Sequence, residues 1–578
     1  NYDVEDLKKE IPGFLDRHLG ESYSDYTERT GLKPSDRNSL HLLSLTDIHL
    51  HGHLTAEAEP NSDIRTIYIF SIIAFMIILV ACINFMNLST ARAGRRAKEI
   101  GLRKVMGAQR KQISFQFLGE SILITFIAMF IGLLIVELTL PAFNWFLGKN
   151  LSLFGEDSLI IFGIALILAL ITGLLSGSYP AIYLSSFRPY SVIKYSSGRR
   201  SGLMRKVLVV FQFSTSIALI VAVIVIYSQM QLLREKDLGY EREEVMQVEA
   251  DQQFFNKLEA FRTEVMKNPK VRSVTRSSLI PSDMLVNNAG GATLDGEELL
   301  PLSFRLAVID CDYEYFETYK IDFAEGRPFS KEYGLDDSLS FILNETAVKR
   351  LGWDPREAVG KPFAYGGKRG RIIGVTKDFY FESLHNEIVP VIFRFGNPGD
   401  MFRLSIRVHP EGKYETIRFI EEVYTQTRPG YPFNYQFIDE ILYDLYDRES
   451  NQAVILGLFT VLSLVIACLG LLGLASFTAE QRTREIGVRK VFGASAGDVI
   501  LLLSKEFLKW VLIANIIAWP VAYLLMEEWL SNFAYSIDMS AWIFIASAVV
   551  ALLIALTTVI LQAYRAANLD PVRALRYE

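Results

Sequence analysis

The sequence is poor in residues that bind metals or form disulfides. It has 3 cysteines and 7 histidines among 578 residues, and no cysteine spacing resembles a zinc module or a disulfide framework. The one histidine cluster is His49, His51 and His53, which would share one face of a strand. No cysteine or carboxylate stands beside it except Asp47, so we expect an exposed strand there and no metal site.

The sequence also lacks a phosphate-binding loop. The pattern Gly-x-x-x-x-Gly-Lys-Ser/Thr does not occur, so ATP must be bound elsewhere, and we expect this chain to hold no cofactor. The glycine-rich stretch 366–370 has the wrong spacing and is predicted to be a hairpin loop. The remaining histidines are scattered, which excludes a Ser-His-Asp arrangement, and the net charge of −6 does not indicate a nucleic-acid binder. We therefore predict no catalytic residue.

Long apolar runs account for much of the chain. Half of the residues (50%) are hydrophobic and the mean hydropathy is +0.23, yet 21% are charged, so the apolar residues must be segregated. A helix needs about 20 apolar residues to cross the hydrocarbon core of a bilayer. Seven stretches qualify: 66–89, 118–141, 158–183, 207–229, 452–477, 507–526 and 541–563. The chain is therefore predicted to be a polytopic α-helical membrane protein.

The short loops indicate its orientation. Lys and Arg number eight in residues 91–112, six in 188–206 and four in 481–490, whereas 143–157 contains only Lys149. Basic loops remain in the cytoplasm, so these three loops are predicted to be cytoplasmic. The N-terminal piece and the region between the fourth and fifth helices then lie outside the cytoplasm.

The polar region between the fourth and fifth helices has the pattern of a folded α+β domain. Roughly 220 residues can bury a core and are enough for two subdomains. Helical and β-rich patterns alternate in it. The helical runs are 254–266 and 414–425, and the β-rich runs are 271–280, 303–308, 371–375 and 403–408. Asn344 is placed to cap a short helix that begins at Glu345, and the aromatic residues of 378–381 are expected to lie in the core.

One motif occurs twice, 386 residues apart. Residues 99–108 read Glu-Ile-Gly-Leu-Arg-Lys-Val-Met-Gly-Ala, and residues 485–494 read Glu-Ile-Gly-Val-Arg-Lys-Val-Phe-Gly-Ala. The same offset aligns Cys82 with Cys468 and Glu120 with Glu506. A weaker echo relates 186–189 to 568–571, each with a proline. The chain therefore contains two parallel three-helix units with a basic loop after the first helix of each.

The residue types of the motif describe a short interfacial helix. Glutamate and arginine four residues apart support a helical turn, lysine and arginine present cations, and glycine allows close approach or a bend. The candidate residues are Glu99, Gly101, Arg103, Lys104 and Gly107 in the first copy and Glu485, Gly487, Arg489, Lys490 and Gly493 in the second. Cations alone would be explained by anionic lipid. The repeated glycines and glutamate favour a repeated partner, such as a protein dimer under the membrane.

Two further acids stand near the cytoplasmic start of the second helix of each unit. Glu120 and Glu506 lie in apolar surroundings, where a charged residue usually faces the protein interior and finds a partner. Each could instead lie at headgroup level, satisfied by water or by a lysine such as Lys505. We hypothesise that each pairs with a basic residue of its own loop and transmits its movement.

The duplicated loop resembles that of the FtsX-like permease domain, which is found in MacB-type ABC transporters, in the LolC/LolE lipoprotein extractors and in FtsX itself. The segments Cys-Ile-Asn-Phe-Met-Asn-Leu at 82–88 and Lys-Asp-Leu-Gly-Tyr at 236–240 are similar to the large duplicated permeases of Bacteroidetes-type bacteria. The polar outside region resembles the MacB-like periplasmic core more weakly.

This resemblance implies a function. In the family, the loop is a coupling helix that docks on a cytoplasmic ATPase dimer, which binds ATP and Mg²⁺. ATPase closure then moves the membrane helices and the periplasmic domains, a mechanism called mechanotransmission, and substrate is expelled or extracted on the outer side. Envelope proteins can be further partners. Drugs, peptides, lipoproteins and lipids all stay open as substrates.

The resemblance also divides the chain. It predicts the tail of a first periplasmic domain at 1–62, a first FtsX-like unit at 63–190, a link and membrane helix at 191–230, a periplasmic MacB-like core at 231–450 and a second FtsX-like unit at 451–578. Because the sequence begins with Asn1 and duplicated members have eight membrane helices, we expect a longer protein whose first helix is missing here.

Two other functions are weighed against transport. The first is an FtsX-like regulatory scaffold that transmits the state of an ATPase to periplasmic hydrolases without moving a substrate. The second is an ion-driven secondary transporter, which predicts acids at mid-membrane and broken helices. The helix centres are almost purely apolar, which disfavours the second.

Overall fold

The computed structural model describes residues 4–20, 27, 31, 33–45, 48, 64–91, 100, 102–185, 199–285, 288–289, 292–294, 306–365, 368–397 and 399–567. The chain forms two compact units, Asn1–Ile73 and Ala74–Glu578. The histidine cluster at 49–53 and the two proline-containing segments 186–189 and 568–571 lie outside the described residues.

Within its described residues before residue 64, the first compact unit contains two N-terminal helices. Helix α1 (Val4–Leu19) is amphipathic and buries Leu15, and α3 (Pro34–Arg37) begins with a proline, whose missing N–H costs nothing at that position. The backbone N–H of Ser35 donates to Oδ1 of Asp16 at 3.0 Å, which ties α3 to α1.

Seven helices in the described part of the chain are long and apolar enough to cross a membrane, which confirms the seven predicted spans. They are α5 (Ile64–Ala91), α7 (Arg110–Leu147), α8 (Ser158–Ser185), α10 (Arg199–Glu235), α19 (Asp447–Gln481), α21 (Ala496–Leu530) and α22 (Ala541–Ala567). Several extend beyond their apolar run, because a helix continues into polar turns until a capping residue ends it. Helix α7, for example, begins at Arg110, whereas its apolar run begins at 118.

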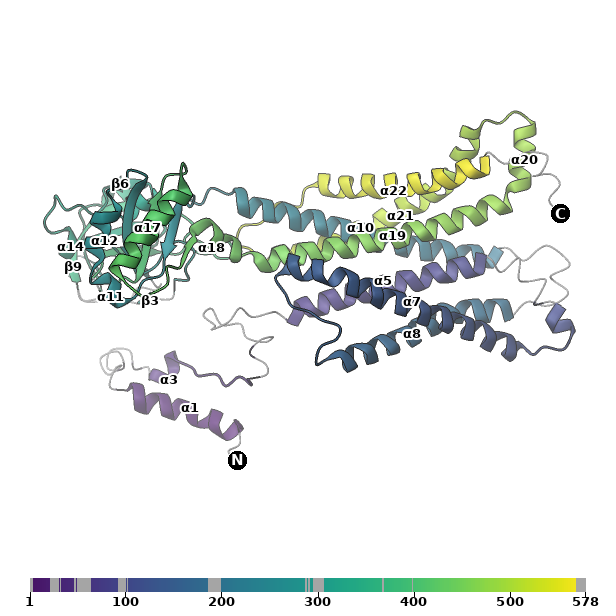
Figure 1. Ribbon diagram of the computed structural model, residues 1–578, viewed down its shortest axis with the longest axis horizontal. Helices are drawn as coiled ribbons and strands as arrows, with labels where there is room; N and C mark the ends of the chain where they lie inside the picture. Colours follow the sequence, from purple (N-terminus) through teal and green to yellow (C-terminus); the bar gives the residue numbers. More distant parts are fainter. Residues whose placement is uncertain are drawn as a thin grey trace. The chain divides into compact units, whose positions relative to one another are not determined.

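The membrane helices pack through small residues. Helices α10, α19, α21 and α22 lie side by side, and alanines such as Ala514 and Ala551 are buried between them (Figure 1). Helix α7 packs on α8 through glycine: a Cβ on Gly177 would lie 2.7 Å from Cβ of Ser121. Small residues let helix backbones approach, which is how helices associate in lipid.

Between α10 and α19 the chain forms the predicted α+β domain. Its twelve described strands make one sheet of mixed parallel and antiparallel pairs in the order β12-β1-β11-β2-β5-β10-β7-β9-β8-β4, with β3 on β5 and β6 on β9. The strands are β1 (Val245–Val248), β2 (Val271–Ser277), β3 (Asn288–Ala289), β4 (Ala292–Leu294), β5 (Leu306–Cys311), β6 (Phe323–Gly326), β7 (Ser340–Asn344), β8 (Pro362–Tyr365), β9 (Lys368–Thr376), β10 (Val391–Phe395), β11 (Arg403–Val408) and β12 (Tyr435–Phe437). The helices are α11 (Gln252–Phe255), α12 (Leu258–Val265), α13 (Tyr315–Tyr319), α14 (Asp336–Leu339), α15 (Glu345–Arg350), α16 (Pro355–Ala358), α17 (Lys413–Thr427) and α18 (Ile438–Asp444).

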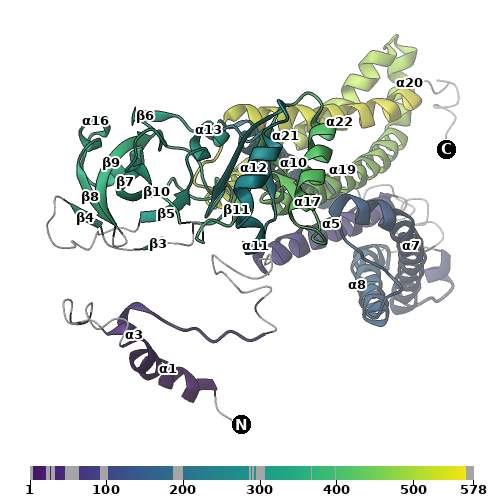
Figure 2. The ribbon, with the colours of Figure 1, turned by 60° about the vertical axis from the view of Figure 1, so that its left-hand side comes forward.

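This sheet carries two separate apolar cores. One lies where α12 and α17 pack side by side against β1, β2 and β11, around Phe254, Phe261 and Tyr424 (Figure 2). The other lies around β7 to β10 and includes Phe341 and Phe363. The two expected subdomains are therefore two cores on one continuous sheet.

Local predictions for this domain agree with the structure. Asn344 caps α15, its Oδ1 accepting the backbone N–H of Ala347 at 3.0 Å. Strands β8 and β9 pair antiparallel with Tyr365 opposite Lys368, so they form the arms of the hairpin predicted at 366–370, whose residues 366 and 367 are outside the described part.

Candidate functional site

The two copies of the repeated loop, residues 100–109 and 483–495, which we call the elbows, end their helices in the same way. In the first elbow the N–H of Gly107 donates to the carbonyl of Lys104 at 3.1 Å and that of Ala108 to the carbonyl of Arg103 at 3.0 Å. The second elbow repeats both bonds 386 residues later, from Gly493 and Ala494, each at 3.0 Å. This is a Schellman helix ending, which places a left-handed residue after the last turn. Gly107 and Gly493 supply it, with φ of 97° and 88°.

The helix that follows each elbow is also capped alike. The N–H of Gln109 donates to the side chain of Gln112 at 3.0 Å, and the N–H of Ser495 donates to the carboxylate of Asp498 at 2.9 Å. A side chain that reaches back in this way satisfies a free N–H at the start of a helix. Each elbow therefore has a fixed connection to the membrane helix after it.

A buried isoleucine anchors each elbow. Ile100 is 3% exposed and packs with Ile113 and Ala181, while Ile486 is 4% exposed and packs with Val499 and Ala563. These anchors are the second residue of the motif, which sequence reasoning did not single out. An apolar residue between a glutamate and a glycine gives no sign of its role until its burial is known.

The basic residues of the elbows have several different contacts. Nζ of Lys104 donates to the carbonyl of Ser185 at 2.6 Å, at the C-terminal end of α8, where cations stabilise a helix. Burial, and then the charge of Arg110, holds the pKa of the Lys104 amine below its ordinary value. In the second elbow Nη2 of Arg489 lies 2.7 Å from Oε1 of Glu485, which is the predicted pair. Glu99 and Gly101 lie outside the described residues.

Glu120 is connected to its elbow through one intermediate side chain. Nη1 of Arg103 donates to Oε1 of Gln116 at 2.7 Å, and Nε2 of Gln116 donates to Oε1 of Glu120 at 3.2 Å. The second three-helix unit has Leu502 at the position equivalent to Gln116. An apolar side chain cannot form the hydrogen bonds that connect Arg103 to Glu120 in the first. The side chain of Glu506 lies outside the described residues.

Each elbow also presents an apolar face to solvent. The sequence did not predict this face, because residue type alone does not show which apolar side chains are exposed. Large apolar side chains are exposed at three matching positions of each copy. They are Leu102, Val105 and Met106 in the first elbow and Val488, Val491 and Phe492 in the second. Met106 is 81% exposed and Phe492 is 85% exposed. Positions i, i+3 and i+4 share one helix face, and clustered exposed apolar residues mark contact sites.

At the outer end of the helices the segment 236–240 joins α10 to the extracytoplasmic domain. The N–H of Tyr380 donates to the carbonyl of Leu238 at 2.9 Å. Gly239 has a φ of 78°, and a Cβ there would lie 2.8 Å from Cβ of Phe379. Tyr240 is buried edge-on against Phe379. This close fit explains the Lys-Asp-Leu-Gly-Tyr sequence.

The loop between α21 and α22, residues 531–540, is held by α10. Gln229 is fully buried; its Nε2 donates to the carbonyl of Tyr535 and its Oε1 accepts the N–H of Ile537, both at 2.9 Å. The ring of Tyr535 packs edge-on against Tyr380 with centroids 4.9 Å apart, and Nζ of Lys236 lies 4.9 Å from the Tyr535 ring.

His385 makes the second contact between this loop and the domain. Its ring stacks on Phe533, and its carbonyl accepts the N–H of Ala534 at 3.3 Å. Its Nε2 lies 3.5 Å from Oε1 of Glu449, near the start of α19. We call the contact of residues 378–388 with residues 531–540 the clasp.

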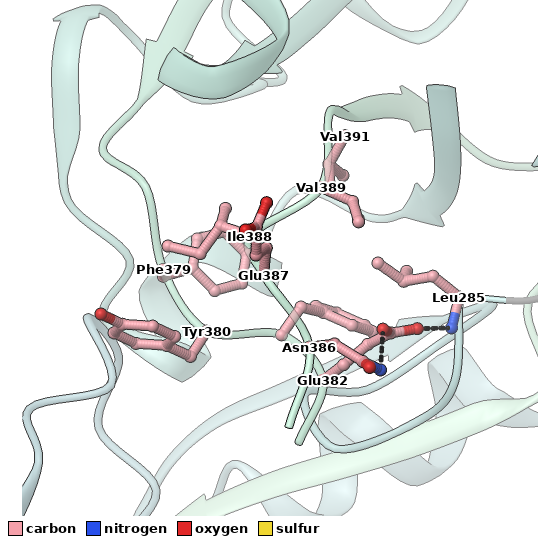
Figure 3. A pocket seen from close by; sticks show the side chains of 10 residues that line it. Leu285, Phe379, Tyr380, Glu382, Asn386, Glu387, Ile388, Val389 and Val391 are labelled. Atoms are coloured by element: carbon pink, nitrogen blue, oxygen red, sulfur yellow. Dashed lines mark hydrogen bonds between the residues drawn. The ribbon is translucent and has the colours of Figure 1, made fainter. Parts of the chain in front are cut away.

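Behind the clasp, residues 378–391 line a small pocket of the domain (Figure 3). Glu382 accepts the N–H of Leu285 at 2.6 Å and Nδ2 of Asn386 at 2.9 Å, which fixes this segment to the domain. Phe379 and Phe381 are buried, as predicted, whereas half-buried Tyr380 packs against Tyr535 of the loop between α21 and α22 and not in the core.

Two family models match the chain. The FtsX-like permease C-terminal model matches residues 71–189 and again residues 457–571, and the MacB-like periplasmic core domain model matches residues 214–418. The first two ranges contain the elbows and the third contains most of the sheet.

Individual relatives and solved structures are more distant. The chain is 27% identical over 287 residues to the macrolide export ATP-binding/permease protein MacB of Chromobacterium violaceum, covering 47% of this chain and 43% of that protein. It is 24% identical over 278 residues to the ABC transporter permease YknZ of Bacillus subtilis, covering 46% and 68%. The chain thus spans about half the length of the first of these relatives. The periplasmic region of MacB from Actinobacillus actinomycetemcomitans aligns at 14% identity with a TM-score of 0.26, covering 37% of this chain and 97% of that one.

The matched regions bring together the features built above. The MacB-like domain is extracytoplasmic, so the elbows, at the opposite ends of the helices, are on the cytoplasmic side. The chain belongs to the FtsX-like permease family, as a multi-pass permease of the MacB/FtsX type with two FtsX-like domains and a MacB-like periplasmic core between them.

Proposed function

We propose that the chain couples ATP hydrolysis by a separate cytoplasmic ATPase to movement of its extracytoplasmic domain, so that a substrate is expelled or extracted on the outer side. The observation that supports this is the continuity of α21. The helix is capped at the second elbow by Ser495 and ends at Leu530, where residues 531–540 enter the clasp. Its 35 residues correspond to roughly 50 Å at 1.5 Å per residue, enough to cross a membrane.

A displacement of the second elbow has a defined route along this helix. Ile486 packs against Val499 of α21 and Ala563 of α22, so the elbow cannot move without these helices. At the outer end, the loop 531–540 is hydrogen-bonded to Gln229 and stacked on His385. A movement of α21 would therefore be passed to the extracytoplasmic domain. In the first unit the Arg103–Gln116–Glu120 chain offers a route into α7, and we retain Glu120 and Glu506 as candidates for transmission.

The elbows supply two matching surfaces for one dimeric partner. We propose that the apolar face of each elbow inserts into the ATPase while Arg103 and Arg489 contact its rim. Lys104 caps α8 and is a positioning residue in this scheme. ATP and Mg²⁺ would be held by the ATPase dimer. The membrane would be a bacterial inner membrane, and periplasmic or outer-membrane proteins would be further partners.

The test is reconstitution of the full chain with the ATPase that co-purifies from native membranes. Met106→Ser with Phe492→Ser, and separately Arg103→Glu with Arg489→Glu, should reduce ATPase binding and its stimulation by the permease. Lys111→Glu, a nearby exposed cation at the start of α7, is the matched control and should change neither. Unchanged binding and stimulation in both double variants would refute docking at the elbows. A bound periplasmic hydrolase without substrate flux would select the regulatory scaffold instead.

A further inference from the structure

The segment 82–88, singled out in the sequence, lies against glycines of α19. Asn84 of α5 is 8% exposed, and its Nδ2 donates to the carbonyl of Ile466 at 3.4 Å. A Cβ added to Gly470 would lie 2.8 Å from Oδ1 of Asn84, and one added to Gly473 would overlap the side chain of Leu88. Helix α5, of the first three-helix unit, therefore inserts two side chains into two gaps in α19, of the second three-helix unit.

These contacts lie on the internal symmetry of the repeat. Gly470 is the residue 386 positions after Asn84, and α19 is the equivalent of α5. A residue meets its own equivalent only where the axis relating two copies passes between them. Asn84 and Gly470 therefore mark the axis between the two units.

A third helix completes this contact. Gln212 of α10 is 1% exposed, and its Nε2 donates to the same carbonyl of Ile466 at 3.3 Å. One turn further along, the hydroxyls of Ser216 and Ser463 lie 2.7 Å apart, both fully buried. Interhelical hydrogen bonds hold helices in register in lipid, where water offers no alternative partner.

The two equivalent residues at the axis, Asn84 and Gly470, differ in type. In two identical chains both positions would carry the same residue, and two asparagines would place a Cβ in the gap that Gly470 leaves. One polypeptide that contains both units can combine asparagine on one side with glycine on the other. The direction of insertion, from α5 into α19, is thereby fixed.

We propose that Asn84 and Gln212, with the gaps at Gly470 and Gly473, form a joint through which the two three-helix units hold each other in register and keep the two elbows at a set separation. These are positioning residues. The role of the joint in coordinating two ATPase sites rests on the proposed function, whereas the joint itself does not.

The experiment measures the separation of the elbows in the full chain in lipid nanodiscs, without ATPase. Spin labels at positions 106 and 492, carried by an unnatural amino acid so that the native cysteines remain, report the distance distribution by electron–electron resonance. Gly470→Leu should broaden and shift the distribution. Gly457→Leu, in the same helix but with open space around its Cβ, is the matched control and should leave it unchanged.

A second variant tests the contact itself. Adding Asn84→Ala to Gly470→Leu removes the nearer of the two amides that a Cβ at position 470 would meet, Oδ1 of Asn84 at 2.8 Å and Nε2 of Gln212 at 3.1 Å. It should therefore narrow the distribution in part, which a general loss of stability would not do. If Gly470→Leu does not fold, Asn84→Ala with Gln212→Leu decides, because it removes both donors to Ile466 without adding bulk and should broaden the distribution. A parent-like distribution in Gly470→Leu, no rescue by Asn84→Ala, or a parent-like distribution in the double donor variant would overturn the joint. Because no ATPase is present, these results are independent of whether the elbows dock one.

Discussion

The imidazole of His385 stacks on the ring of Phe533 with centroids 4.4 Å apart and planes 26° from parallel. His385 belongs to the extracytoplasmic domain and Phe533 to the loop that closes α21, so one ring contact joins the folded domain to the end of a membrane helix. The ring of Tyr446 lies on the imidazole at 5.9 Å, which limits its freedom to turn away.

We predict that His385→Ala loosens the clasp. A stacked ring pair contributes about 0.5–1.5 kcal/mol beyond its area. Hydrogen exchange of residues 531–540 should therefore accelerate, whereas His385→Phe, which keeps a ring, should retain most of the protection. His409→Ala, on the loop after β11, is the control histidine. Equal exchange in His385→Ala and the parent would contradict the assignment of this contact.

Gln229→Leu should disrupt the clasp more severely. The substitution leaves the carbonyl of Tyr535 and the N–H of Ile537 without their present partner, and a buried polar group without a hydrogen bond costs about 1–3 kcal/mol. If the clasp transmits movement, ATPase binding should persist while stimulation of the ATPase by the permease is lost. The control is Gln231→Leu, since Gln231 is exposed and donates to Glu235 within α10. Loss of ATPase binding in Gln229→Leu would instead indicate a general folding defect.

Gly107→Ala and Gly493→Ala should each weaken their elbow. Both residues have positive φ, where a side chain costs about 1–2 kcal/mol. Both have open space for a Cβ, so the cost is conformational and not steric. Gly→Asn should be milder at either position, because asparagine tolerates this conformation. The measurement is ATPase affinity of the reconstituted permease, and the same affinity in the alanine and asparagine variants would refute the role of the backbone.

Asp251 should make the domain sensitive to acid. Its hydrogen bond with Arg428 and the N–H of Phe254 hold the pKa of this carboxyl below its ordinary value. A group with a lowered folded-state pKa contributes stability above its unfolded pKa, near 3.9, and loses that contribution as the pH falls through the folded value. The parent should therefore lose its advantage in melting temperature over Asp251→Asn as the pH falls below about 4. A constant difference between the two proteins from pH 7 to pH 3 would show that Asp251 does not titrate in this way.

The elements that depend on local chemistry were predictable, and the contacts between distant segments were not. The membrane helices follow from apolar length, the cap at Asn344 from one side chain, and the Glu485–Arg489 pair from a spacing of four. Gln229 donates to the carbonyl of Tyr535, 306 residues away in the sequence, and no periodicity connects the two residues.

The cytoplasmic residues show a similar limit. The motif marked the elbows, but Gly107 and Gly493 proved to end helices and Lys104 proved to cap α8. The apolar face could not be predicted, because exposure is a property of the fold. Ile100 and Met106 are both apolar, and only the structure shows that Ile100 is buried and Met106 is exposed.

The unlike pair Asn84 and Gly470 bears on how such a chain can evolve. In an assembly of two identical subunits, every substitution at the axis appears on both sides at once and must be compatible with itself. Joining the two copies in one gene removes that restriction, so each side can accumulate changes that only its opposite number has to accommodate. Large-to-small divergence along α5 and α19 is the trace that this freedom should leave. Gly473 is an example: it stands where the first copy has Asn87, and the gap it leaves holds the side chain of Leu88.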